Sequence, residues 1–160
     1  MSRKSLKLTA LLVSILLATS GCAIGFNAPT NQQKPSGNGT SLNSENIQIR
    51  DASVVIDPTK PGRAAFIGTV INTADTQDTL EAVEVDPAIG TGAMPNTMLD
   101  KNQPAIFGYG GTQPLGLTVN SFVKAGNYIE VHLVFANNDM IPLSILVNVN
   151  EGNFQSVVVP

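Results

Sequence analysis

Few side chains in this 160-residue sequence have the chemistry for catalysis. The only histidine, His132, follows Glu130 by two residues, and a histidine beside a carboxylate can transfer protons. Nucleophilic catalysis also needs an activated serine or cysteine, yet no Gly-x-Ser-x-Gly elbow precedes a helix-like segment. Carboxylate pairs such as Glu84 and Asp86 lie at predicted strand ends, where solvated charge is the ordinary role. We predict that the protein is not an enzyme.

A second possible chemistry is copper binding, because Cu(I) prefers thioether and imidazole ligands. Such a site needs at least three converging ligands, and the spacing of the four candidates does not force them together. We expect the methionines to fill irregular gaps in loops and core, and we predict no metal and no other non-covalent cofactor. The candidates are Met94, Met98, His132 and Met140.

The first 21 residues have the features of a lipoprotein signal peptide. A basic start precedes an apolar run from Leu8 to Ala18, which is too short to span a bilayer that needs about 20 residues. The only cysteine of the chain, Cys22, then follows three small residues, as in a lipobox. The residues predicted to be recognised by the signal peptidase are Thr19, Ser20 and Gly21.

A solitary exported cysteine cannot form an internal disulfide, and lipidation of Cys22 explains its presence. The predicted location is therefore the outer face of the cytoplasmic membrane, with the lipid on Cys22 as the anchor. Residues 22–45 read as a flexible tether, because Asn27–Glu45 is rich in Asn, Gln, Gly, Ser and Pro. As a coil, those nineteen residues span roughly 24 Å.

Charge argues against a nucleic-acid partner. Three of the nine Lys and Arg residues lie in the signal peptide, so the mature chain carries six basic against twelve acidic residues, a formal charge of −6. A chain with this charge has no basic stripe to neutralise phosphates.

Residues 46–160 predict an all-β fold: a single antiparallel β-sandwich, immunoglobulin- or cupredoxin-like, with about eight strands. Short β-branched and apolar runs alternate there with Gly, Pro, Asn and Asp clusters, and no helical period is present. The expected strands are 46–56, 63–72, 79–85, 105–108, 115–120, 127–136, 142–149 and 154–159.

Alternation within these runs predicts what each strand faces. Ile129, Val131, Leu133 and Phe135 share one face and should be buried, which turns His132 outward. The first run changes its inward face near residue 51, so a β-bulge is expected there. The second run, 63–72, is apolar on both faces and is expected to be covered on both sides.

The order of the segments resembles the PCu(A)C copper-chaperone family across the whole domain. The matching stretches are INTADTQDTLEAVEVD, SFVKAGNYIEVHLVFANND and a closing valine-rich run. In that family a His-x-Met pair precedes a strand leading to a Lys-x-Gly-Asp turn, which matches 123–127 here. The resemblance then places the two ligands at Gln113 and Leu115, neither of which is a copper ligand.

The chain is also similar to the actinobacterial LpqE lipoprotein group over nearly all its mature length. The shared features are the lipobox, Asn31–Pro35 and Gly37–Gly39 in the tether, and Ile47–Asp51 at the start of the domain. This resemblance implies a ligand-free branch of the same fold and a peripheral place on the respiratory supercomplex of cytochrome bcc and cytochrome oxidase.

Together these observations predict a membrane-tethered, non-enzymatic accessory or scaffold protein bound to a membrane protein complex, with that respiratory supercomplex as the implied partner. The alternative is a periplasmic copper chaperone or metal carrier of the PCu(A)C type. A further alternative is a protein that binds a lipid or an envelope glycan.

Overall fold

The computed structural model describes residues 39–110 and 112–160, and all of their regular structure apart from one short 3-10 turn is β-strand. The predicted signal peptide, Cys22 and most of the predicted tether lie outside the described residues. The predicted all-β class is confirmed. Bounds of the elements are β1 Thr40–Asn43, β2 Ile47–Ile56, β3 Arg63–Asn72, β4 Asp78–Val85, β5 Gly90–Thr91, β6 Thr97–Leu99, β7 Pro104–Phe107, β8 Leu115–Val119, β9 Tyr128–Phe135, β10 Ile141–Val149 and the 3-10 turn η1 Gly152–Phe154.

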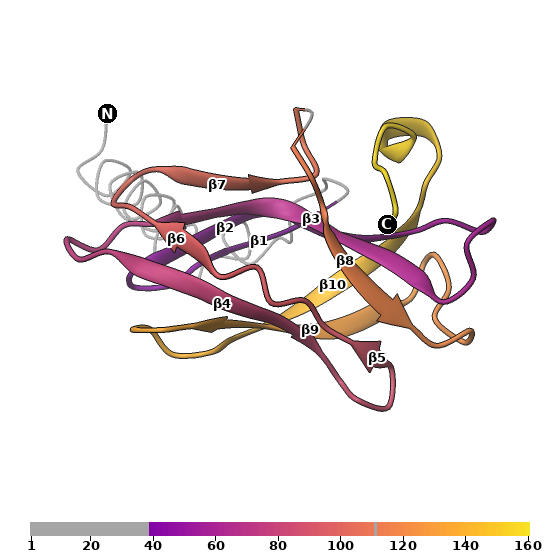
Figure 1. Ribbon diagram of the computed structural model, residues 1–160, viewed down its shortest axis with the longest axis horizontal. Helices are drawn as coiled ribbons and strands as arrows, with labels where there is room; N and C mark the ends of the chain where they lie inside the picture. Colours follow the sequence, from indigo (N-terminus) through magenta and orange to yellow (C-terminus); the bar gives the residue numbers. More distant parts are fainter. Residues whose placement is uncertain (1–38, 111) are drawn as a thin grey trace, which may run out of the picture. The chain divides into compact units, whose positions relative to one another are not determined.

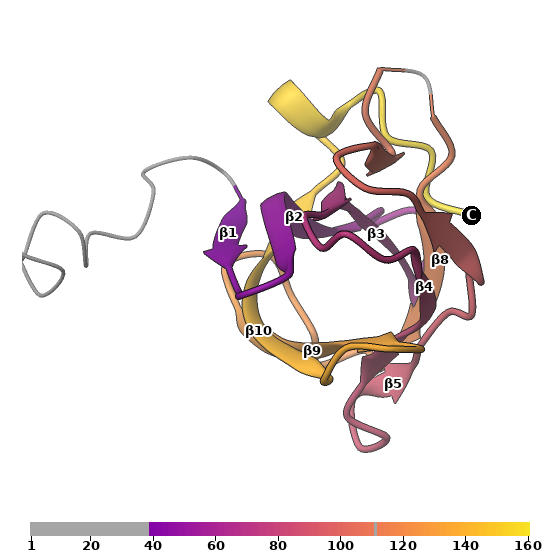
Figure 2. The same ribbon diagram turned by 90° about the vertical axis from the view of Figure 1, so that its left-hand side faces the viewer.

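The strands form one curled sheet in the order β5-β8-β3-β2-β10-β9-β4-β6, with β1 added beside β2 and β7 beside β3. Figure 1 shows it from the side, and Figure 2 shows β2, β10, β9 and β4 arranged around a common interior. All pairings between these named strands are antiparallel except that of β2 with β10, where Val147–Val149 runs parallel to Val54–Ile56. This parallel pair joins the two halves of the sheet, and the sequence pattern did not predict it.

Four segments differ from the strands expected from sequence. Thr40–Asn43, which lies in the stretch expected to be tether, pairs with β2. The short strands Gly90–Thr91 and Thr97–Leu99 have too few apolar residues to stand out from the loop around them. The expected strand at 154–159 is wrong, because Phe154 ends a 3-10 turn and the residues after it are irregular. Apolar residues in this segment are buried, but they have no partner strand to pair with.

The segment around β5 closes the curled sheet by bridging β8 and β4. Gly90 is opposite Val119 of β8, and three residues later Ala93 exchanges two backbone hydrogen bonds with Val83 of β4, at 2.8 and 2.9 Å. A Cβ at Gly90 would lie 1.9 Å from the Thr118 carbonyl oxygen. Glycine is therefore required for this close backbone approach.

The bulge predicted near residue 51 is confirmed. Pairing between β2 and β3 shifts register between Arg50 and Ser53, and Asp51 has a φ of 51°, in the left-handed region. The Tyr109 hydroxyl donates a hydrogen bond to the Asp51 carbonyl oxygen at 2.9 Å. This bulge changes the inward face of β2 halfway along its length.

Apolar side chains fill the interior and also cover one outer face. The main cluster includes the inward rows of β9 and β10, as their alternation predicted. A second cluster lies outside β2 and β3, where Val55, Ala65 and Ile67 are covered by the C-terminal segment. The prediction that strand 63–72 is covered on both faces is thus confirmed. Phe154, Val157 and Val159 form the cover.

Buried polar side chains tie together the end of the domain that carries the β9–β10 turn. The Asp78 carboxylate accepts hydrogen bonds from the backbone N–H groups of Thr79 and Asn137 and from the Asn138 amide, at 2.6 to 2.9 Å. Burial alone would raise the pKa of Asp78, but these hydrogen bonds outweigh burial and lower it. Asn46 in turn donates to Asn138.

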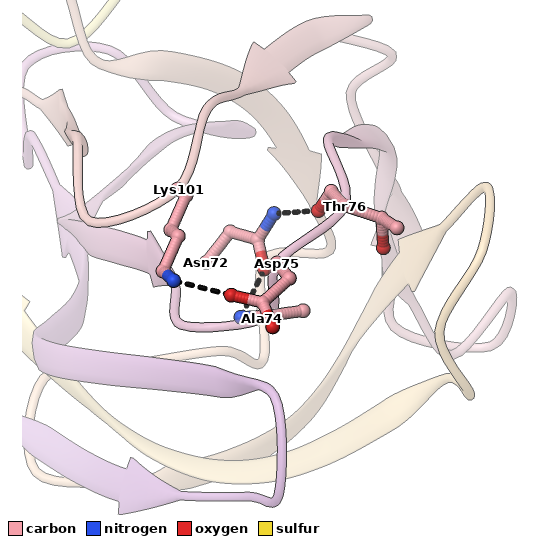
Figure 3. Close-up of polar contacts among 5 residues, drawn as sticks. All are labelled: Asn72, Ala74, Asp75, Thr76 and Lys101. Atoms are coloured by element: carbon pink, nitrogen blue, oxygen red, sulfur yellow. Dashed lines mark hydrogen bonds and ion pairs between the residues drawn. The ribbon is translucent and has the colours of Figure 1, made fainter.

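Asn72 has a similar structural role in the turn between β3 and β4 (Figure 3). Its side chain donates to the carbonyl oxygens of Thr76 and Leu99 and accepts from the backbone N–H of Ala74. Lys101 and Asp75 form an exposed ion pair beside it.

None of the helical structure in the described residues is long and apolar enough to span a membrane.

Candidate functional site

His132 lies on the outer face of β9, as the alternation predicted. Its neighbours Val131 and Leu133 are fully buried, whereas the His132 side chain keeps 27% of its surface exposed. Glu130, two residues earlier on the same face, contacts the imidazole: Glu130 Oε1 lies 2.7 Å from His132 Nε2. The histidine is therefore held by a carboxylate and remains accessible from outside the domain.

Pairing between β4 and β9 adds a second carboxylate to this face. Glu84 is directly opposite His132 in the register of the two strands, and Ala82 is opposite Val134. Side chains of directly opposed residues have Cβ atoms about 5 Å apart. Because Ala82 is small, it leaves space between its larger neighbours on the outer face.

A hollow of about 630 Å³ lies over this part of the sheet. Its lining residues include His132, Met94 and three acidic residues, with no lysine or arginine among them. The electrostatic environment of such a hollow favours a cation over an anion. The three carboxylates belong to Glu84, Asp86 and Glu130.

Met94 reaches the hollow because of the segment that closes the sheet. Ala93 pairs with Val83 and packs against the core, so the next side chain, that of Met94, is turned to the outside. Its exposed fraction is 81%, the highest among the exposed large hydrophobic side chains of the described residues. A thioether therefore lies at the rim of the hollow that contains the only imidazole.

The other two candidate methionines lie elsewhere. Met98 is in β6, opposite Thr79, and is 64% exposed. Met140 is 50% exposed and lines a different hollow, beside Asn137–Pro142. The three methionines are exposed and do not fill gaps in the core, while Met94 and Met140 lie in loops, as the sequence indicated. In the described part of the chain, no three His, Cys, Asp or Glu side chains are placed to hold a metal ion.

The ligand positions implied by the PCu(A)C resemblance lie at the start of β8. Gln113 is exposed, and Leu115 is partly buried against the main core. Leu115 pairs with Phe66 of β3, and neither Gln113 nor Leu115 is among the residues that line the hollow with His132. The implied family site therefore has an amide and a hydrocarbon side chain, and it is not the hollow that contains His132.

Sequence reasoning missed Glu84 as a neighbour of His132. Alternation along β4 is sufficient to place Glu84 on the outer face, but only the register between β4 and β9 brings these two residues together. Met94 was named as a candidate, yet its link to His132 depends on Ala93 pairing with β4, which no local pattern indicates.

No family model and no curated protein matches this sequence. Among solved structures, the copper-bound PCuAC domain from PmoF2 matches with a TM-score of 0.59 and 17% identity, over 68% of this chain and 97% of that one. The apo PCuAC domain from PmoF1 matches with a TM-score of 0.58 and 16% identity, over 68% and 98%. The apo PmoF2 domain gives 0.54 and 17%, over 70% and 97%.

These likenesses establish that the chain has a PCuAC-like fold, the first of the two resemblances noted in the sequence. The similarity spans almost the whole of each solved domain, so the fold of a complete PCuAC domain is present here. Similarity to the LpqE group remains a prediction, as do the lipobox and the lipid on Cys22.

Proposed function

We propose that this protein is an extracytoplasmic copper carrier, tethered to the membrane by lipid on Cys22 and without enzymatic activity. The observation that carries the proposal is the likeness of the domain to PCuAC domains, one of them a copper-bound domain. Copper is the cargo of this function rather than a resident cofactor. The comparisons support this alternative better than the accessory-subunit function that we ranked first from the sequence.

The chemistry of the hollow over β4 and β9 also supports copper. An imidazole and a thioether are ligands that Cu(I) prefers, and both line the same hollow. The three carboxylates around them add negative charge with no lysine or arginine in the lining. An exposed site suits a carrier, because copper must pass to another protein by ligand exchange at the surface.

Anaerobic Cu(I) titration of the mature protein against a chromophoric chelator tests this function. We expect a one-to-one complex with a dissociation constant below about 1 µM, which corresponds to about 8 kcal/mol of binding free energy. Zinc should compete weakly, because a thioether is a poor zinc ligand. Failure of the protein to take Cu(I) from the chelator would reject the copper-carrier function.

Lipid attachment has its own test. Cys22→Ala should abolish labelling by radioactive palmitate and alter the apparent mass of the protein, because the only thiol of the chain is removed. Equal labelling of the variant and the parent would contradict the anchor. A matched Ser20→Ala variant keeps a small residue before the cysteine and should be lipidated normally.

Docking on a membrane complex is the second candidate, favoured by exposed apolar side chains. Tyr128 of β9 is exposed and is opposite Leu146 of β10. Two residues before Leu146, the carbonyl oxygen of Ser144 accepts a hydrogen bond from the hydroxyl of Thr40, which is near the start of the described chain. A tether raises the effective concentration of the domain at its membrane to roughly millimolar, so a modest interface suffices. The respiratory supercomplex is the partner proposed for this function.

Affinity purification of a C-terminally tagged chain from detergent-solubilised membranes tests the docking function. Recovery of haem-containing subunits at low salt, and their loss at high salt, is the expected result, since the acidic domain would face a basic surface. Recovery of the tagged chain alone would reject this candidate.

A further inference from the structure

We propose that the copper ion binds at His132 Nδ1 and the Met94 thioether, with Glu84 as the third ligand and Glu130 as the residue that positions the imidazole. This inference rests on the proposed copper-carrier function and assigns its site. It moves the metal from the positions implied by the family resemblance, at and just before β8, to the hollow over β4 and β9, two neighbouring strands labelled in Figures 1 and 2.

The contact between Glu130 and His132 determines which ring nitrogen is available. An ionised carboxylate can only accept a hydrogen bond, so the Nε2 atom that lies 2.7 Å from Glu130 Oε1 must carry a proton. In the neutral imidazole the lone pair then resides on Nδ1. Metal-binding histidines generally donate their other N–H to a carboxylate or carbonyl in this way, which fixes the orientation of the ring.

Met94 is the exposed residue that directly follows the segment closing the sheet. The side chain is 81% exposed, whereas its neighbour Ala93 packs against the core. The closing segment 90–93 is held between β8 and β4 by backbone hydrogen bonds and lacks the room for side chains at Gly90 and Gly92, where a Cβ would lie 1.9 and 2.1 Å from carbonyl oxygens. The flexible thioether is thus attached to a fixed piece of backbone at the rim of the hollow.

Glu84 is assigned as the third ligand because strand register places it next to the segments that carry the other two. It is directly opposite His132 in strand register, and it is one residue from Val83, the pairing partner of Ala93. A site that depends on a thioether favours Cu(I) over Zn(II).

The positions implied by the family offer no competing site. Gln113 is an amide and Leu115 has no lone pair, and Leu115 contributes instead to the packing of the core. The two remaining methionines, Met98 and Met140, are absent from the lining of the hollow and serve as internal controls.

The experiment measures Cu(I) affinity of the mature protein by chelator competition for the parent and for Met94→Leu, His132→Asn and Glu84→Gln. Leucine has nearly the volume of methionine but no sulfur, and position 94 is exposed, so folding should be unaffected. We expect Met94→Leu and His132→Asn each to weaken binding at least tenfold. The matched controls Met98→Leu and Met140→Leu should bind like the parent, and Glu130→Gln should weaken binding by roughly tenfold or more through loss of ring orientation.

A second readout follows the metal directly, because one histidine gives one set of imidazole signals. Cu(I) is diamagnetic, and its binding should shift the ¹⁵N resonance of His132 Nδ1 while Nε2 stays protonated, together with the methyl signal of Met94 alone among the described methionines. Circular dichroism verifies that each variant is folded.

The outcomes separate the two proposals. If the parent does not bind Cu(I), the copper-carrier function fails and the site fails with it. If the parent binds copper but Met94→Leu and His132→Asn bind equally well, or if Met98→Leu or Met140→Leu is the variant that loses binding, the site is wrong while the function stands.

Discussion

Two outer faces of the same curled sheet differ in whether other parts of the chain cover them. Over β2 and β3, the chain covers Val55, Ala65 and Ile67 with its own C-terminal segment, so the face becomes a second small core. Over β4 and β9, no such cover exists in the described residues, and the face carries His132 and Glu84 beside a hollow. The first face contributes stability, and the second leaves ligand-bearing side chains open.

This difference between a covered and an open face separates the residues that stabilise the fold from those that can bind a ligand. Buried polar groups such as Asp78 and Asn72 have their hydrogen bonds satisfied within the protein and hold a turn or a strand end in place. The imidazole of His132 has one carboxylate partner and an open hollow in front of it. Substitutions on the covered face should therefore change stability, and substitutions on the open face should change binding.

The largest effect should come from uncovering the apolar face. Phe154→Ala removes a buried ring from the cover over β2 and β3 and should lower the free energy of unfolding by about 3 kcal/mol. Urea denaturation followed by circular dichroism measures the change. The control is Val158→Ala, whose exposed side chain should alter stability by less than about 0.5 kcal/mol. Similar stabilities for the two variants would contradict a covering role for this segment.

Closure of the sheet can be tested at Gly90. Gly90→Ala places a Cβ 1.9 Å from the Thr118 carbonyl oxygen, so the closing segment must move away from β8 at a cost of about 2 kcal/mol. Because that segment carries Met94, Cu(I) affinity should fall as well. Gly126→Ala offers a comparison in which no atom lies near the new Cβ, although its φ of 88° adds backbone strain. A Gly90→Ala protein with parental stability and affinity would refute the closing role.

Acid should weaken the polar network around Asp78. The folded-state pKa of Asp78 lies below its ordinary value of 3.8, so the carboxylate contributes stability above about pH 4 and loses that contribution as the pH falls through the folded pKa. Asp78→Asn turns an amide N–H toward the Asn138 donor and should cost about 2 kcal/mol at pH 7. Unfolding curves from pH 7 to pH 3 should show this cost shrinking on acidification. A pH-independent difference would argue against the hydrogen-bonded carboxylate.

The smallest effect on stability is expected on the open face. His132→Asn and Glu84→Gln change side chains that make no contribution to the core, and each should shift the free energy of unfolding by less than about 0.5 kcal/mol. Thermal unfolding without metal measures this shift. Destabilisation comparable to that of Phe154→Ala would remove the contrast between the two faces and assign the open face a structural role.

The sequence by itself determined the strands with strong alternation and the faces that they bury. The inward row of β9, the bulge at Asp51 and the double coverage of β3 all followed from residue patterns, because side chains in a strand alternate with a period of two. The same patterns did not reveal that Phe154–Val159 covers a face without joining the sheet, since burial and strand pairing have similar signatures along a chain.

Tertiary structure alone decided which residues of the candidate site meet. His132, Glu84 and Met94 come from three separate segments, and their proximity depends on the register of β4 with β9 and on the pairing of Ala93 with Val83. Such register is set by long-range backbone hydrogen bonds and by the closure of the sheet at two glycines, neither of which leaves a local periodicity. Met98 and Met140 have the same side-chain chemistry as Met94, and only the fold separates them from the hollow.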